Sequence, residues 1–225
     1  MSTLTMGLNA SQMPEIARPD AGVALVTQWT VGAPDRQEAS ADAALAAWER
    51  VPWPQDLLSM NSYVGTSGAD VLTYSQWTSA EAYREFLRSG GPPPDIERPD
   101  PVMYRLYRSR TSNRRPPGCI VVVEVKFDGP DEPRQRRWVD TVFEALDAEP
   151  VLHPGGIAGY FHLSIDGTRV LNYAEWTSEE AHCEAIENSG QGTVGGGTKW
   201  REVRDFPGVL SSGFTRYRFF RGRTK

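Results

Sequence analysis

The feature that most constrains the fold of this chain is a six-residue pattern that occurs twice. Residues 74–79 read YSQWTS and residues 173–178 read YAEWTS. The two tryptophans, Trp77 and Trp176, are 99 residues apart. Solenoid and propeller repeats have periods of about 20 to 50 residues, so a spacing of this length indicates a duplicated domain.

The similarity extends well beyond the pattern. Val71 and Leu72 match Val170 and Leu171 at the same spacing. The last segments also match, with YRLYRSR at residues 104–110 and YRFFRGR at residues 217–223, but these are 113 residues apart. The second copy therefore carries about 14 additional residues. They lie between Ser189 and Gly213, where a glycine-rich run predicts a flexible segment.

Length and composition agree with two domains. The 225 residues divide into four predicted parts, which are a tail (1–21), repeat 1 (22–110), a linker (111–118) and repeat 2 (119–225). A net charge of −5 without a basic block argues against a nucleic-acid-binding protein. Two cysteines at different repeat positions predict neither a disulfide framework nor a metal cluster. The absence of a long apolar run and of a signal peptide predicts a cytoplasmic protein.

The hydrophobic pattern of each copy predicts the element order β-α-β-β-α-β, a ferredoxin-like unit of the α+β class. Asp166-Gly167 is typical of a hairpin turn between the second and third strands. Thr78 and Thr177, each followed three residues later by glutamate, predict capping boxes at the next helix. The predicted elements fall at 23–31, 40–50, 58–64 and 102–108 in copy one, and at 132–148, 157–165, 170–176 and 214–221 in copy two.

Residues 160–176, which read YFHLSIDGTRVLNYAEW, resemble the antibiotic biosynthesis monooxygenase family. The pattern is closest to the cofactor-independent, quinone-forming members that tailor aromatic polyketides, and it covers essentially the whole chain as two fused copies. The resemblance implies that the two ferredoxin-like repeats pair their sheets as an intramolecular dimeric α+β barrel. It also implies a substrate cavity between each sheet and its helices.

The resemblance assigns site residues by position. The family's asparagine and tryptophan on strand three correspond to Asn172 and Trp176, and a histidine on strand two corresponds to His162. A helix tyrosine corresponds to Tyr83 in copy one, but His182 stands at that position in copy two. Copy one has Thr73 in place of the asparagine and keeps Trp77, which makes copy two the more nearly catalytic one.

Strand geometry gives these residues a chemistry of their own. Because side chains alternate, Asn172, Ala174 and Trp176 share one face, with space for a flat ligand over the alanine. The asparagine amide can donate to a phenolate or a developing quinone oxygen, and His162 can act as the base or position the phenol. Tryptophans at such positions also serve as packed core, so both roles stay open for them. The predicted substrate-binding residues are Tyr160, Trp77, Thr73, Tyr83 and His182.

The leading hypothesis is a monooxygenase that oxidises an anthrone-type phenol to a quinone or hydroxylated product. It predicts no cofactor and no metal site, with molecular oxygen as co-substrate and a small aromatic polyketide as substrate. It predicts no nucleic-acid or membrane partner and leaves a further homodimer open. Three alternatives keep the same fold: a polyketide cyclase or other non-oxidative tailoring enzyme, a haem-binding relative, and a non-catalytic binding protein.

Overall fold

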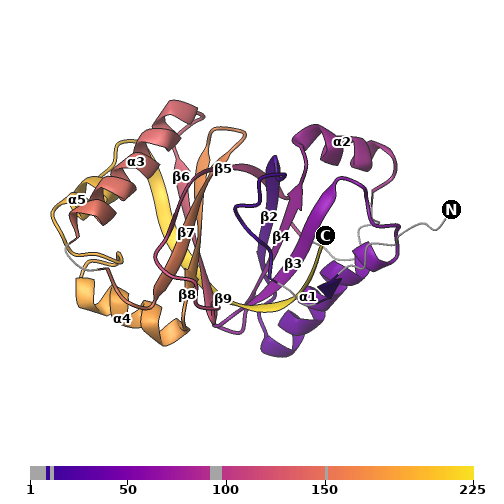
Figure 1. Ribbon diagram of the computed structural model, residues 1–225, viewed down its shortest axis with the longest axis horizontal. Helices are drawn as coiled ribbons and strands as arrows, with labels where there is room; N and C mark the ends of the chain where they lie inside the picture. Colours follow the sequence, from indigo (N-terminus) through magenta and orange to yellow (C-terminus); the bar gives the residue numbers. More distant parts are fainter. Residues whose placement is uncertain (1–8, 11–12, 92–97, 150–151) are drawn as a thin grey trace. The chain divides into compact units, whose positions relative to one another are not determined.

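The computed structural model describes residues 9–10, 13–91, 98–149 and 152–225, and the chain forms two compact units (Figure 1). Unit 1 comprises Met1–Met103 together with Tyr217–Lys225, and unit 2 comprises Tyr104–Arg216. Among the described residues, no helix is long and apolar enough to span a membrane.

Unit 1 is an antiparallel sheet with two helices covering one face (Figure 1). Its strands run in the order β9-β3-β4-β2, and a two-residue strand, β1, pairs with the free edge of β9. The elements are β1 (Asn9–Ala10), β2 (Val23–Thr30), α1 (Pro34–Glu49), β3 (Leu57–Gly65), β4 (Asp70–Trp77), α2 (Ala80–Arg88) and the second half of β9 (Val209–Thr224).

Unit 2 repeats this plan with additions. The strands run in the order β5-β7-β8-β6, and the helices again cover one face (Figure 1). The elements are β5 (Val102–Thr111), β6 (Cys119–Phe127), α3 (Glu132–Ala148), β7 (Gly156–Ser164), β8 (Arg169–Trp176), α4 (Glu179–Ser189), α5 (Lys199–Arg204) and the first half of β9. Helix α5 lies in the segment that only copy two carries, and the sequence pattern did not predict it.

The compact units differ from the sequence repeats in their last strands. Strand β5 ends repeat 1, but it pairs with β7, where Tyr104 lies opposite Ser164. The second half of β9 ends repeat 2, but it pairs with β3, where Gly222 lies opposite Asn61. Each repeat therefore contributes its final strand to the unit built mainly from the other repeat.

A buried glutamine fixes the hairpin in each unit. The Gln37 side chain donates from α1 to the carbonyls of Gly65 and Asp70 at 2.9 and 2.8 Å, where β3 turns into β4. In unit 2, Gln135 donates from α3 to Ser164 Oγ at 3.0 Å and to the carbonyl of Arg169. Since buried polar groups need partners, these hydrogen bonds attach α1 to the β3–β4 hairpin and α3 to the β7–β8 hairpin.

The helix that follows each hairpin begins one residue later than predicted. Ser79 and Ser178 are the N-caps, and their hydroxyls accept from the amides of Ala82 and Ala181. Thr78 instead donates to the Asp56 carboxylate at 2.7 Å. The capping-box assignment to the threonines is therefore wrong by one position, because the adjacent serine competes for the same role.

Helix boundaries and the predicted tail also differ from expectation in unit 1. Helix α1 begins at Pro34, six residues before the predicted start, because proline suits the first turn of a helix. Ile16, within the predicted tail, is only 3% exposed. The carbonyls of Glu15 and Ile16 accept from Gln76 Nε2, so this segment packs against β4. Residues 1–8 and 11–12 of the predicted tail lie outside the described residues.

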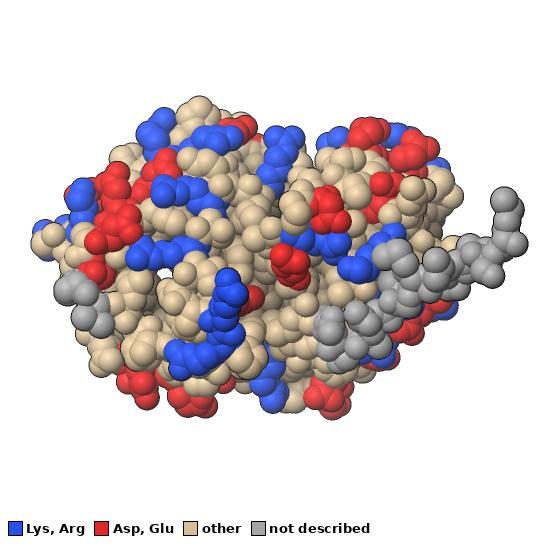
Figure 2. All heavy atoms as spheres, viewed as in Figure 1, with Lys and Arg blue, Asp and Glu red and all other residues tan. Residues whose placement is uncertain are grey.

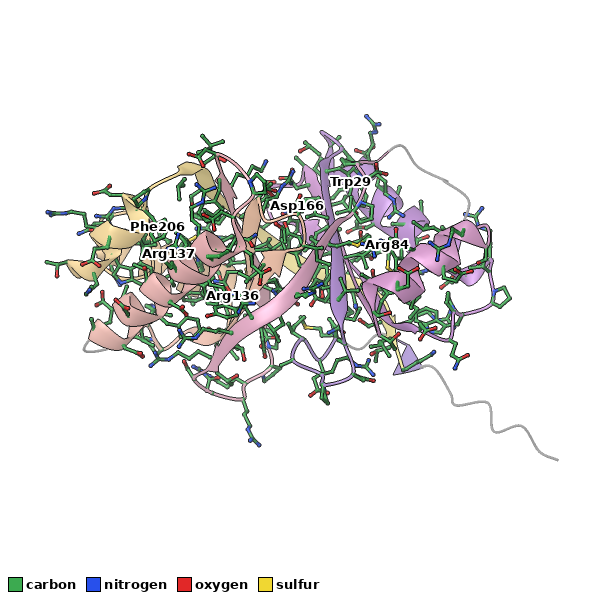
Figure 3. The ribbon with its side chains drawn as sticks, turned by 90° about the horizontal axis from the view of Figure 1, so that it is seen from above. Trp29, Arg84, Arg136, Arg137, Asp166 and Phe206 are labelled. Carbon is green, nitrogen blue, oxygen red and sulfur yellow. The ribbon has the colours of Figure 1, made fainter. Side chains whose placement is uncertain are left out.

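Helix α3 shows how unit 2 acquires its core. Trp138, Val139 and Val142 are buried on its inner face. Arg136 and Arg137 are exposed on the same helix (Figure 3), and Arg136 pairs with Glu132 in the first turn. This division into an apolar stripe and a charged face is what a helix packed on a sheet requires.

Candidate active site

Unit 2 contains a cavity of about 350 Å³ between its sheet and its three helices. Figure 2 shows the surface of this unit hollowed at the left of the view. The volume lies within the range of sites for small organic molecules, about 300 to 1,000 Å³. Most of the wall is apolar, and the apolar side chains include Val121, Val123, Trp138, Val142, Phe161 and Ile186.

The cavity exists because small residues stand where unit 1 has large ones. Strand register places Gly159 opposite Ala174, and in unit 1 it places Met60 opposite Ser75. Met60 is 3% exposed, so its side chain fills the position that Gly159 leaves open.

The helices repeat this difference in size. Counting from the matched helix starts, Ala185 on α4 corresponds to Phe86 on α2, and Leu146 on α3 corresponds to Trp48 on α1. Phe86 stacks on Trp48 with ring centroids 5.4 Å apart, and both rings contact Trp77. Aromatic packing thus fills in unit 1 the space that is open in unit 2.

Asn172 presents an unpartnered polar atom at the cavity wall. It lies on β8 opposite Phe161, and its Oδ1 is buried without a hydrogen-bond partner among the described residues. A side chain built at Gly159 would place its first carbon 3.4 Å from this oxygen. Leaving such an acceptor unpaired costs about 1–3 kcal/mol, so the arrangement favours a ligand that donates a hydrogen bond.

Trp176 forms an aromatic corner of the cavity with two histidines. The His182 ring lies 4.9 Å from the Trp176 ring at 78°, and the His153 ring lies 5.9 Å from it. Phe214 on β9 contacts the other side of His182, with ring centroids 5.0 Å apart. All four side chains line the cavity, and the two edge-to-face contacts of His182 fix the orientation of its ring.

The electrostatic environment keeps His182 neutral. Burial, followed by the nearby charge of Arg216, lowers the pKa of His182 to about 4. Arg216 Nε donates to His182 Nδ1 at 2.9 Å. At neutral pH this side chain is therefore an uncharged hydrogen-bonding group.

His162 and Tyr160 do not share this cavity. They alternate with Phe161 along β7, and their cross-strand partners are Leu171 and Tyr173. His162 is 1% exposed, its Nδ1 donates to the Tyr160 carbonyl at 2.9 Å, and burial lowers its pKa to about 4. The expectation that His162 serves as base beside Asn172 is thus wrong on geometry, because the strand turns its side chain to the opposite face.

The candidates from repeat 1 lie in unit 1. Trp77 is completely buried in the aromatic packing, with Tyr83 5.2 Å away at 65°. Burial raises the pKa of the Tyr83 hydroxyl. Thr73 on β4 is also buried and lies opposite Ser62. Of the predicted site residues, the structure thus brings Asn172, Trp176 and His182 together around one cavity. Trp77, Tyr83 and Thr73 do not line it.

Several cavity residues were missed by sequence reasoning. Gly159 was detectable, because a position-by-position comparison of the copies pairs it with Met60. His153 and Arg216 gave no such signal, since neither belongs to the matching patterns. Glu175, which precedes Trp176 on β8, is also among the residues that line the cavity, and burial raises its pKa to about 6.

No protein-family model and no curated protein matches the sequence. Solved structures do match it. An anthrone oxidase-like protein aligns with a TM-score of 0.71 and 16% identity, covering 92% of this chain and 94% of that one. A candidate monooxygenase of Fusobacterium nucleatum aligns with a TM-score of 0.56 and 6% identity, covering 92% and 96%. A candidate monooxygenase of Lactobacillus acidophilus aligns with a TM-score of 0.50 and 12% identity, covering 89% of this chain and 94% of that one.

At these identities the likeness concerns the fold, and it extends over both repeats. The predicted α+β class with two ferredoxin-like repeats is confirmed. The chain shares its α+β fold with these solved structures, in agreement with the fold that its sequence resemblance implies.

Proposed function

We propose that this protein is a cofactor-independent monooxygenase that oxidises a flat, phenolic substrate of the anthrone type inside unit 2. The observation that carries the proposal is the unpartnered Asn172 oxygen at the wall of an otherwise largely apolar cavity. A hydrocarbon ligand would leave this acceptor unpaired, whereas a phenol would satisfy it and bury its rings. The likeness of the fold to that of an anthrone oxidase-like protein supports the same substrate class.

The proposed reaction draws its electrons from the substrate. Loss of a proton from the methylene carbon of an anthrone gives an electron-rich enolate, which reduces dioxygen and forms a carbon–oxygen bond. Cleavage of the oxygen–oxygen bond then gives the quinone carbonyl, and the second oxygen atom leaves as water. Both hydrogens of the methylene group end in that water, so no external reductant is needed.

The protein's part is to bind, orient and exclude water. Asn172 holds a phenolic oxygen, and the ring of Trp176 supplies a flat apolar surface. Negative charge develops on the substrate oxygens as the enolate forms, and fixed hydrogen-bond donors in a dry site stabilise such charge strongly. Asn172 Nδ2 is the donor that we assign to this role.

The test is oxygen consumption by metal-stripped protein. Protein treated with a chelator is mixed with a hydroxylated anthrone in air, and dioxygen uptake and quinone absorbance are followed together. Because anthrones oxidise slowly by themselves, buffer and heat-denatured protein serve as blanks. The proposal predicts uptake of one dioxygen per quinone formed, at a rate proportional to protein concentration.

Two results would contradict the proposal. One is a rate no higher than the blanks with several hydroxylated anthrones. The other is conversion of a polyketide substrate to a cyclised product without oxygen uptake, which would favour the cyclase alternative. A Soret band on titration with haemin would point to the haem-binding alternative instead.

A further inference from the structure

We propose that Arg216 is a positioning residue that holds His182 in one tautomer, with Nε2–H as a donor to a substrate oxygen. The tautomer follows from the geometry of the pair alone. The role toward substrate rests on the proposed function and extends it, because it adds a donor to the acceptor that Asn172 provides.

The hydrogen bond between these two side chains allows one assignment of the ring proton. Arg216 Nε lies 2.9 Å from His182 Nδ1. A guanidinium group carries only donors, so Nδ1 must accept and cannot carry a proton. In a neutral imidazole the proton then resides on Nε2, which leaves that nitrogen as a donor.

Three side chains hold the His182 ring in place: Arg216 by its hydrogen bond, and Trp176 and Phe214 by ring contacts. Trp176 on β8 and Phe214 on β9 both contact it edge-to-face, and His182 is 2% exposed. The Arg216 guanidinium carbon also lies 5.0 Å from the centre of the Phe214 ring. Phe214 therefore contacts both partners of the hydrogen bond, so strand β9 sets the position of the pair.

A neutral donor at His182 restricts the substrates that the cavity can bind well. With Asn172 Oδ1 as an unpartnered acceptor and His182 Nε2–H as a donor, the cavity suits a ligand with both a hydroxyl group and an accepting oxygen. A hydroxylated aromatic ketone has both groups on one planar ring system. A hydroxyl-free anthrone offers only the acceptor, and a simple phenol lacks the carbonyl.

The first experiment reads the tautomer without any substrate. The chain has three histidines, so long-range ¹H–¹⁵N spectra of labelled protein resolve each ring. Three variants are compared with the wild type: Arg216→Met, which removes donor and charge, Arg216→Lys, which keeps the charge, and Arg218→Met, an exposed control on the same strand. We expect the Nε2–H form of His182 in the wild type and in Arg218→Met, and a mixture of tautomers in Arg216→Met.

A second measurement tests the role toward substrate. Arg216→Met is expected to lower kcat/KM for a hydroxylated anthrone about tenfold, the loss of roughly one good hydrogen bond. His182→Gln keeps an N–H donor and should retain more activity than His182→Phe. In the His182→Gln background, Arg216→Met should have no further effect.

The outcomes separate the two proposals. A His182 ring that is Nδ1-protonated in the wild type, or one whose spectrum is the same in Arg216→Met and Arg216→Lys as in the wild type, overturns the positioning role. A shifted tautomer together with no oxidation of any anthrone by the wild type leaves the Arg216–His182 assignment standing and rejects the proposed function. Equal activity of His182→Phe and the wild type rejects the role toward substrate.

Discussion

At the scale of single residues, Asn172 differs from an ordinary buried amide. Its oxygen has no partner among the described residues, although buried polar groups are nearly always paired. The corresponding residue in unit 1 is Thr73, which is buried. A residue that is kept at a cost to folding, and that faces a cavity, has the properties of a functional side chain.

Replacing Asn172 with alanine should separate activity from stability. We expect Asn172→Ala to lower kcat about 100-fold, since it removes a group that stabilises developing charge. The free energy of unfolding should stay the same or rise, because an unpaired buried acceptor is removed. Steady-state kinetics and urea denaturation measure the two effects. Thr73→Ala is the matched control, and an equal loss of activity there would mean that the site is in the wrong repeat.

Glu175 makes a separate prediction about pH. Burial raises its pKa from 4.5 to about 6, so the folded state binds the proton more tightly than the unfolded state. Stability from this group is therefore full below pH 4.5 and is lost as the pH rises through about 6. Glu175→Gln, which introduces the residue that unit 1 has at Gln76, should be more stable at neutral pH by up to about 1 kcal/mol after allowing for solvent screening. The gain should vanish in acid, and an equal gain at both pH values would refute the assignment.

At the scale of elements, the two copies differ in side-chain size on shared backbones. Gly159 on β7 lines the cavity where unit 1 has the buried Met60, and Ala185 on α4 is the smaller counterpart of Phe86. Because unit 1 folds with methionine at this strand position, the same residue in β7 is compatible with the sheet. The cavity can therefore be closed by a change that the fold already tolerates.

Gly159→Met is expected to abolish ligand binding while leaving the fold intact. The side chain would occupy the space over Asn172, since even its first carbon would lie 3.4 Å from the amide oxygen. Affinity for a hydroxylated anthrone should fall by at least about 100-fold, with the melting temperature near that of the wild type. Isothermal titration calorimetry and circular dichroism measure both. Gly159→Ala serves as the size control and should lose far less affinity.

The sequence predicted the elements better than their pairing. Hairpins, alternating strands and the Trp77 and Trp176 positions followed from local patterns, because turn residues and side-chain alternation act over short distances. The helix caps were misplaced by one residue, since threonine and serine stand side by side. The face of His162 depended on the register of β7, where a one-residue difference moves a side chain to the other side.

At the scale of the whole molecule, the exchange of final strands between the repeats could not be predicted from the sequence. The segments 104–110 and 217–223 are nearly alike, so no local feature distinguishes pairing within a repeat from pairing with the other one. For the same reason the bounds of the compact units could not be predicted, because they differ from the bounds of the repeats. The pairing of His182 with Arg216 could not be predicted either, because the fold brings these two residues together.

The strand exchange predicts which part of the chain depends on the C-terminus. Tyr217 is 1% exposed in unit 1, and its hydroxyl donates to Gln28 Oε1 at 3.0 Å. A chain ending at Arg216 should therefore lose protection of the β3 amides, although β3 belongs to the first repeat. Hydrogen exchange with mass spectrometry measures this loss, and full-length Arg218→Gln is the control. Unchanged protection of β3 in the shortened chain would contradict the assignment of β9 to this unit.

Isotopic labelling tests most directly whether the cavity of unit 2 uses dioxygen to oxidise an aromatic substrate. A hydroxylated anthrone is incubated under ¹⁸O₂ with wild-type protein and, in parallel, with Gly159→Met, and the quinone is analysed by mass spectrometry. We expect one ¹⁸O atom in each quinone formed by the wild type, and only the background rate with the variant. Oxygen derived from water, or equal rates with both proteins, would contradict this expectation.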